Sequence, residues 1–373
     1  MSMLEGLRVL DMSRLLPGPF ATWLLQAHGA EVVKLEDARG GDYLRWIPPF
    51  DGELGAMFTA LNRDKRSLTL DLRHSEGQRA LRALLPRYDV VLESFRPGVL
   101  ARFGLDFQQL ALEHPRLVFA SLSGFGQTHA WAQQPGHDIN FEGMAGLLAP
   151  GARLDGVPTL PALPVADLAG GSLMAAFTIC AALLRRERTG QGRVLDLSMT
   201  DGAATLLYPL LATTLASAKP PPPGGDMLTG AHPCYGIYRC GDGRLLTLAA
   251  LEPQFLKVLQ DRTGLAGVAT RQKLEALFLT QPRHHWVELL ASACVAPLLE
   301  LDELLEGSLV ASRGVLGLGD HGLWACPPAG LAAKGPAPAL GAHSRVELEA
   351  AGVDFDALRA LKVSTEPPSP EDG

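Results

Sequence analysis

Short apolar runs alternate with amphipathic stretches over the first half of the chain. Short runs rich in leucine and valine at residues 7–12, 31–35 and 89–93 predict strands, and the stretch 19–28, closed by Gly29, predicts a helix. Further strands are predicted at residues 67–72, 117–121 and 193–198. This alternation predicts an α/β fold with a large, doubly wound parallel sheet, in which ligands bind at the carboxyl ends of the strands.

The clearest change along the chain is the run of four prolines and two glycines within residues 219–225. Prolines stiffen the backbone and glycines release it, so the run predicts a linker between domains. Beyond it, residues 235–239 and 244–251 flank a glycine-containing turn and predict a hairpin, and helices are predicted at 253–261 and within 271–293.

The predicted organisation has four parts. They are a large α/β domain, residues 1–200, completed by about 330–363; a helical and proline-rich linker, 201–232; a smaller α+β domain, 233–328; and a disordered tail, 364–373.

Composition excludes several classes of function. The formal net charge of −7 and the lack of a basic run argue against a nucleic-acid surface. The uncharged stretch 168–184 is interpreted as a buried core helix rather than a membrane span. The five cysteines are scattered and never spaced as CxxC, so neither a disulfide framework nor a metal site is predicted. With no signal pattern in its first residues, the protein is expected to be cytoplasmic.

Three ionisable groups stand where predicted strands or loops become helices. The imidazole of His137 can exchange protons near neutral pH, and the adjacent Asp138 can orient the ring or offer its N–H to a carbonyl oxygen. Asp167 precedes an apolar helix, where a capping role worth about 1 kcal/mol is the plain alternative. Gly170 and Gly171 each cost about 1 kcal/mol relative to alanine, so close approach of another group to this helix start is expected.

Glu252 precedes Pro253, where it can simply be an acidic group at a helix start. If it lies beside Asp167, the two carboxyls cannot both ionise easily and one pKa rises. Such a pair opposite His137 suits removal of a proton from the carbon beside a thioester and its return to the other face, through an enolate that needs hydrogen-bond donors.

The segments that carry these groups resemble a known family. Residues 136–138, 167–171 and 251–255 are similar to the active-site segments of the α-methylacyl-CoA racemases, which belong to the family III, formyl-CoA-transferase-like CoA transferases. The resemblance extends over about residues 4–313. It implies epimerisation of 2-methylacyl-CoA thioesters without a metal or redox cofactor, with His137 facing an Asp167/Glu252 pair.

The resemblance also implies an interlocked homodimer, in which the partner chain supplies Glu252. In the related transferases, the counterpart of Asp167 is a nucleophile that forms acyl and CoA thioesters, and the histidine is generally absent. CoA transfer between carboxylic acids is therefore the alternative activity, and a non-catalytic CoA-binding protein is a third hypothesis.

Coenzyme A would need cationic groups for its phosphates. Basic segments at residues 62–66 and 94–98 stand at ends of predicted strands, where anions bind, although such residues are often plain solvated surface. The resemblance places similar segments against the nucleotide. The candidate CoA-binding residues are Arg39, Arg63, Lys65, Arg66, Arg96 and Arg102.

Overall fold

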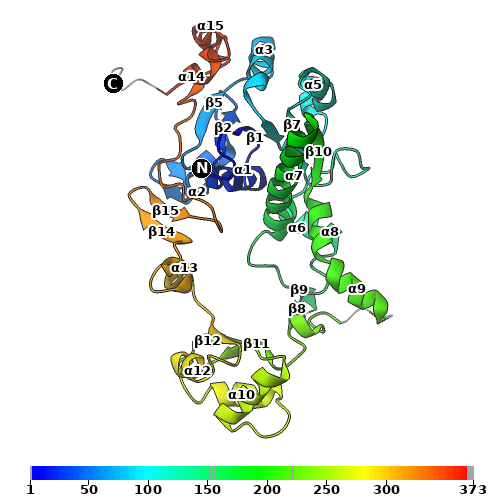
Figure 1. Cartoon of the computed structure of the whole chain (residues 1–373), viewed down its shortest axis with the longest axis vertical. Helices are drawn as coiled ribbons and strands as arrows, with labels where there is room; N and C mark the ends of the chain where they lie inside the picture. The colour runs from blue at the N-terminus through cyan, green and yellow to red at the C-terminus, as the bar shows by residue number, and fades with distance from the viewer. Residues whose placement is uncertain (1, 152, 155, 218, 220–221, 368–373) are drawn as a thin grey trace. The chain divides into compact units, whose positions relative to one another are not determined.

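The computed structural model describes residues 2–151, 153–154, 156–217, 219 and 222–367 (Figure 1). It contains two compact units. The first comprises Met1–Ala145, Pro161–Leu207 and Gly314–Gly373, and the second comprises Gly146–Leu160 and Tyr208–Arg313. Of the predicted linker and tail, residues 218, 220–221 and 368–373 lie outside the described residues.

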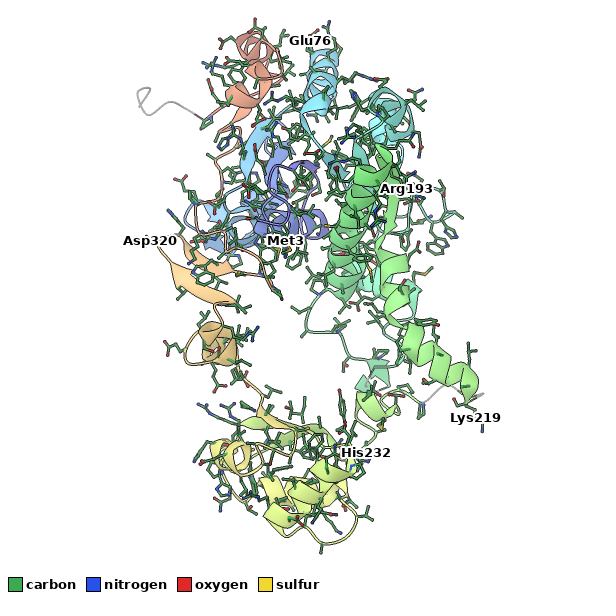
Figure 2. The ribbon with its side chains drawn as sticks, viewed as in Figure 1. Met3, Glu76, Arg193, Lys219, His232 and Asp320 are labelled. Carbon is green, nitrogen blue, oxygen red and sulfur yellow. The ribbon has the colours of Figure 1, made fainter. Side chains whose placement is uncertain are left out.

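The first unit is built on a parallel sheet of six strands in the order β10-β7-β6-β1-β2-β5. The strands are β1 (Arg8–Met12), β2 (Glu31–Glu36), β5 (Arg66–Thr69), β6 (Val90–Glu93), β7 (Val118–Ser123) and β10 (Arg193–Ser198). Each pair runs parallel. The prediction of an α/β fold with a large parallel sheet is confirmed, and Arg193 at the start of β10 is labelled in Figure 2.

The order of the strands places the expected ligand site between β1 and β6. β2 and β5 lie on one side of β1, whereas β7 and β10 lie on its other side (Figure 1), with β6 paired between β1 and β7. The two halves therefore wind outward from β1, and the order reverses between β1 and β6. In open α/β sheets, ligands bind outside the carboxyl ends of the strands at this switch point.

The helices of the first unit follow the predicted alternation. They include α1 (Pro17–Ala27), α3 (Ser75–Leu84), α5 (Phe107–Glu113) and α7 (Met174–Thr189). α7 continues from η3 (Ala166–Leu173), a π-helical segment, and ends at Gly190, whose φ of 71° is left-handed. Such π-turns are rare and often occur at functional sites.

Residues Ala166–Thr189 form the one helix among the described residues that is long and apolar enough to cross a membrane, with a mean hydropathy of 1.7. By length and composition alone this is weak support for a span. In the structure α7 packs against β7, β10 and α1. It covers the sheet, but only 39% of its apolar stretch is buried, so it is not the fully buried core helix that the sequence predicted.

The helical part of the linker predicted at residues 201–232 consists of two helices, α8 (Met199–Leu206) and α9 (Tyr208–Ala216). α8 packs closely on η3, because a Cβ atom at Gly170 would lie 2.6 Å from the backbone nitrogen of Ala203. A Cβ atom at Gly202 would lie 1.9 Å from the carbonyl oxygen of Gly170. The expected close approach is confirmed, and the neighbour is α8.

The C-terminal residues complete the first unit. Leu348 of α14 (Ser344–Glu349) and Phe355 of α15 (Phe355–Ala360) are buried in its main core. Ser364 Oγ donates to the Thr69 carbonyl oxygen at 2.7 Å, and Thr365 N donates to Thr69 Oγ1 at 2.8 Å. The prediction that disorder begins at residue 364 was wrong for these residues, because they hydrogen-bond to the last residue of edge strand β5.

The second unit contains the predicted hairpin. β11 (Tyr235–Arg239) pairs with β12 (Leu245–Ala249), and β13 (Val295–Pro297) pairs with β12, all antiparallel. Its helices include α10 (Pro253–Thr263), α11 (Arg271–Phe278) and α12 (Arg283–Leu289). The rings of Tyr238, Phe278 and Trp286 meet in its core.

Shorter elements complete the two units. They are β3 (Phe50–Asp51), β4 (Leu54–Gly55), α2 (Ala56–Asn62), α4 (Val99–Arg102), α6 (Asp138–Ala145), β8 (Arg153–Leu154), β9 (Val157–Pro158), α13 (Leu309–Ser312), β14 (Leu316–Gly319) and β15 (Gly322–Ala325). Asp320, labelled in Figure 2, lies in the turn between β14 and β15.

Candidate active site

A cavity of about 720 Å³ lies at the switch point of the sheet. The loops that follow β1, β6 and β7 line it, together with the start of α6 and part of η3. Its polar lining includes Arg14, Ser94, Arg96, His137 and Asp167. His137 and Asp167, predicted to act together, therefore share one cavity.

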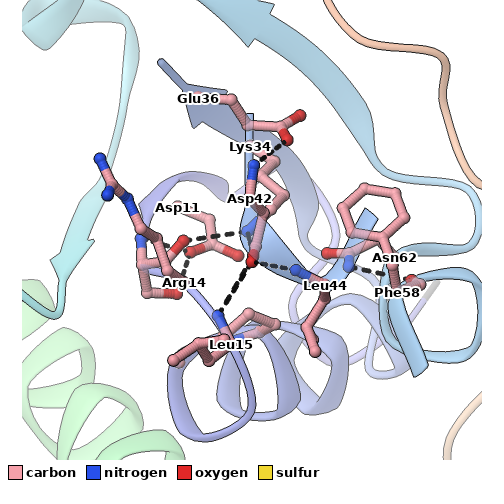
Figure 3. Close-up of polar contacts among 12 residues, drawn as sticks. Asp11, Arg14, Leu15, Lys34, Glu36, Asp42, Leu44, Phe58 and Asn62 are labelled. Atoms are coloured by element: carbon pink, nitrogen blue, oxygen red, sulfur yellow. Dashed lines mark hydrogen bonds and ion pairs between the residues drawn. The ribbon is translucent and has the colours of Figure 1, made fainter. Parts of the chain in front are cut away.

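A cluster of buried charges holds the β1 loop in place. We call this set the ion cluster; it comprises Asp11, Lys34, Glu36, Asp42, Arg45 and Lys65. Lys34 Nζ pairs with Asp42 Oδ2 at 3.0 Å and donates to the Ser13 carbonyl oxygen at 2.9 Å. Asp42 Oδ1 accepts from Leu15 N at 3.1 Å (Figure 3), which supports the left-handed backbone of Leu15, with a φ of 61°.

Arg14 in the same loop is a cavity residue that the sequence analysis missed. Figure 3 shows its guanidinium directed away from the ion cluster. The guanidinium carbon lies 5.2 Å from the centre of the Phe95 ring and 5.5 Å from that of Tyr43. Among the described residues, no carboxylate forms an ion pair with it, so its charge is open to an anionic ligand. Its place directly after the first strand of a doubly wound sheet was the available signal.

His137 stands in a tight turn at the start of α6. Its carbonyl oxygen accepts from Asn140 N at 2.8 Å, and its own N–H donates to Asn140 Oδ1 at 3.0 Å. A Cβ atom at Gly136 would lie 2.6 Å from the ring of Phe141. Gly136 therefore leaves room for the Phe141 ring, and His137 remains exposed on the cavity.

One interpretation of the sequence was that the Asp167 side chain caps its helix. In the structure, no side-chain capping hydrogen bond is made at the N-cap of η3. The N–H of Asp167 donates to Asp138 Oδ1 at 2.8 Å, and Val165 N donates to Glu142 Oε1 at 2.9 Å. Two acids of α6 therefore occupy the free N–H groups at the start of η3. The N–H groups of Val165 and Asp167 are thus already engaged and are not free donors for an enolate.

Asp138, Glu142 and Asp167 form a second set of close acidic groups, which we call the acid cluster. Burial raises the pKa of Asp167, and the nearby carboxyls of Asp138 and Glu142 raise it further, to about 7. Burial, together with Asp138, also raises the pKa of Glu142. The sequence analysis expected Glu252 to perturb Asp167, but here the perturbation comes from α6. Glu142 was missed because a single acid among apolar residues gives no signal by itself.

Glu252 belongs to the second unit and is exposed. It occupies the N-cap position of α10, where its carbonyl oxygen accepts from Phe255 N and Leu256 N, but its carboxyl makes no capping hydrogen bond. Its pairing with Asp167 stays a prediction.

The predicted CoA-binding residues fall into two groups, of which the first is exposed. Arg96 is exposed and lines the cavity. Arg39 is exposed and pairs with Asp71 at 3.1 Å. Arg102 is exposed on α4, outside the residues that line the cavity.

The second group is engaged inside the protein. Arg63 Nη1 donates to the Gly335 carbonyl oxygen at 3.1 Å, Lys65 Nζ donates to Thr22 Oγ1 at 2.8 Å, and Arg66 pairs with a carboxyl oxygen of Glu347 at 2.7 Å. Arg63 and Lys65 are buried. The expectation of nucleotide contacts needs correction for Arg63 and Lys65, because burial and internal partners engage their cationic groups. The Arg66 side chain is 31% exposed, and its contact with a nucleotide stays a prediction.

Residues 4–344 match the CoA-transferase family III. The chain belongs to this family. It is 35% identical to the α-methylacyl-CoA racemase of Homo sapiens, with 96% of each chain covered. It is also 33% identical to the acetyl-CoA:oxalate CoA-transferase of Acetobacter aceti, over 84% of this chain and 85% of that one.

A crystal structure of a CaiB/BaiF family protein from Brucella suis resembles the chain with a TM-score of 0.81 and 30% identity. It covers 93% of this chain and 99% of the other. The family predicted from the sequence is thereby confirmed. In the part of the chain that the structure describes, no group of three or more His, Cys, Asp or Glu side chains could hold a metal ion.

Proposed function

We propose that this family III protein is an epimerase that inverts the α-carbon of 2-methylacyl-CoA thioesters. The observation that supports it is the placement of His137 and Asp167 on one cavity, with the pKa of Asp167 raised to about 7. A carboxyl tuned in this way exchanges protons at neutral pH, as imidazoles generally do. Two such groups are what a two-base proton transfer needs.

In one direction, the Asp167 carboxylate removes the α-proton and the C–H electron pair passes into an enolate. His137, in its protonated form, then delivers a proton to the opposite face of the carbon. In the reverse direction the roles exchange. The proposed steps move only protons, so they need neither a metal nor a redox cofactor.

Arg14 and Arg96 are the cations of the cavity lining and suit the phosphates of coenzyme A. A second copy of the chain is the partner that we expect. Apolar side chains of one helical face, Leu173, Phe177 and Leu184, are 51%, 72% and 58% exposed in the single chain, and a homodimer interface would cover them. The expected role of the partner's Glu252 rests on this homodimer.

The test is incubation of a 2-methylacyl-CoA with the protein in deuterated water, with the α-proton followed by NMR. General acid–base groups contribute about 10²- to 10⁴-fold each, so His137→Ala and Asp167→Asn should each lower α-proton exchange by at least about 10²-fold. Wild-type protein that exchanges no α-proton, or a His137→Ala variant as fast as wild type, would contradict the proposal.

CoA transfer between carboxylic acids is the second candidate, favoured by the similarity to the Acetobacter aceti transferase. In that reaction the Asp167 carboxylate would attack the thioester carbonyl, thiolate would leave as CoA, and a mixed anhydride would form. Hydroxylamine trapping at Asp167, seen only when an acyl-CoA is present, would support this candidate and contradict the two-base scheme.

A further inference from the structure

Glu142 is the most deeply buried member of the acid cluster. Its side chain is 0% exposed, and it lies one helical turn after Asp138, so both carboxyls occupy the same face of α6. Oε1 accepts from Val165 N at 2.9 Å. Oε2 is buried and receives no hydrogen bond from an N–H or O–H group of the described residues. The proposed catalytic steps leave this group without a role.

The neighbour that can satisfy Oε2 is the carboxyl of Asp138, one turn earlier on the same face of α6. Asp138 Oδ1 accepts from Asp167 N at 2.8 Å, only two residues beyond the Val165 N–H that Glu142 holds, so the two carboxyls meet at the same helix start. Two ionised carboxylates cannot hydrogen-bond, but a carboxyl and a carboxylate that share one proton can. The charged groups that act on Glu142 and Asp167 are acids, and a buried charge without an opposite partner is costly. A shared proton is therefore the arrangement that satisfies both acids.

We propose that Glu142 is a positioning residue whose carboxyl shares one proton with Asp138, and that the pair fixes the start of η3 and so aims Asp167 into the cavity. The two carboxyls hold the N–H groups of residues 165 and 167 directly on either side of the backbone that carries the Asp167 side chain. The effect on catalysis rests on the proposed function. The proton sharing does not, because it concerns the ligand-free protein.

The elements around the Asp138–Glu142 pair, α6, η3 and α8, carry no lysine or arginine. α6 packs against η3 and α8. η3 contributes Asp167, α8 carries Asp201, which is exposed, and His137 lies directly before α6 on the cavity. The raised pKa values of Glu142 and Asp167 agree with a cluster made of acids alone.

Glu142→Gln and Glu142→Leu separate this role from a purely structural one. The glutamine amide can accept from Val165 N and donate to Asp138, as the protonated acid does, whereas leucine can do neither. Misplacing a catalytic group by about 1 Å can cost on the order of 10²-fold. We therefore expect α-proton exchange within about threefold of wild type in Glu142→Gln and a loss of about 30-fold, chiefly in kcat, in Glu142→Leu.

Whether Asp138 and Glu142 share a proton can be tested without substrate. Side-chain carboxyl ¹³C NMR of the ligand-free, full-length protein, assigned with Glu142→Gln and Asp138→Asn, should show one carboxyl of the pair still protonated at pH 7. Hydrogen exchange should protect the Val165 amide in wild type and in Glu142→Gln and expose it in Glu142→Leu. Two ionised carboxyls at pH 7, or a Glu142→Gln variant as impaired as Glu142→Leu, would overturn the proposal. If wild-type protein exchanges no α-proton of the substrate, the function proposed above fails. The carboxyl ¹³C NMR and amide hydrogen exchange of the ligand-free protein still test the role of Glu142.

Discussion

The first unit contains two sets of charged side chains, and they solve the problem of burial in opposite ways. In the ion cluster, acids and bases alternate: Arg45 pairs with Glu36 at 2.7 Å and Lys34 pairs with Asp42 at 3.0 Å. In the acid cluster, no described cation pairs with the carboxyls. The first arrangement fixes charges in place, and the second makes a proton easy to move.

The pKa values reflect this difference. Burial alone would raise the pKa of Asp11, but the charges of Lys34 and Lys65 lower it to about 2, so it stays ionised. Burial raises the pKa of Asp167 to about 7, and its neighbours act in the same direction. The buried Asp11 and the half-buried Asp167 thus differ because of the sign of the charge beside them.

The largest effect on stability should come from breaking the ion cluster. Lys34→Met leaves Asp42 buried and unpaired, so the free energy of unfolding should fall by about 3 to 5 kcal/mol, measured by urea denaturation at pH 7. Lys257→Met is the control, because its pair with Asp261 is exposed and worth about 0.3 to 0.5 kcal/mol. Equal losses in the free energy of unfolding would show that the buried Lys34–Asp42 pair matters no more to stability than an exposed ion pair.

The acid cluster should respond in the opposite direction. Asp167→Asn removes a carboxyl whose pKa is raised from 3.8 to about 7. Between these values the folded protein binds this proton more strongly than the unfolded chain does, so the contribution of Asp167 to stability falls as pH rises through that window. The full shift corresponds to roughly 4 kcal/mol, and partial exposure reduces it to about 2 kcal/mol.

Asp167→Asn should therefore be more stable than wild type by about 2 kcal/mol at pH 8 and nearly equal to it at pH 4, measured by denaturation at both values. The same variant should lose catalysis. A variant that is less stable at pH 8 than at pH 4, relative to wild type, would mean that Asp167 is ionised and favourably paired in the folded protein.

The smallest effect concerns cations that belong to neither cluster. Arg96→Ala should raise KM for an acyl-CoA about tenfold, since a charge-assisted hydrogen bond to a phosphate is worth about 1.5 kcal/mol. Arg79→Ala, an exposed arginine of α3 outside the cavity, is the matched control and should leave KM unchanged. An unchanged KM in Arg96→Ala would remove Arg96 from the proposed phosphate site.

The amino-acid pattern alone predicted a parallel, doubly wound sheet and singled out His137 and Asp167 as candidate site residues. Short β-branched and apolar runs such as residues 90–93 favour strands, and the motifs around residues 136–138 and 167–171 are the segments that pointed to the family. Local patterning and short motifs are sufficient for such features because each depends on neighbouring residues.

Which charged side chains meet depends on the packing of the folded chain. Arg63 and Lys65 are as basic in the sequence as Arg96, yet they are buried with internal partners while Arg96 lines the cavity. Glu142 and Asp167 are distant in sequence, and their coupling follows from the packing of α6 on η3. Burial and the sign of the nearest charge set the chemistry of an ionisable group, and both arise from contacts that no local pattern encodes.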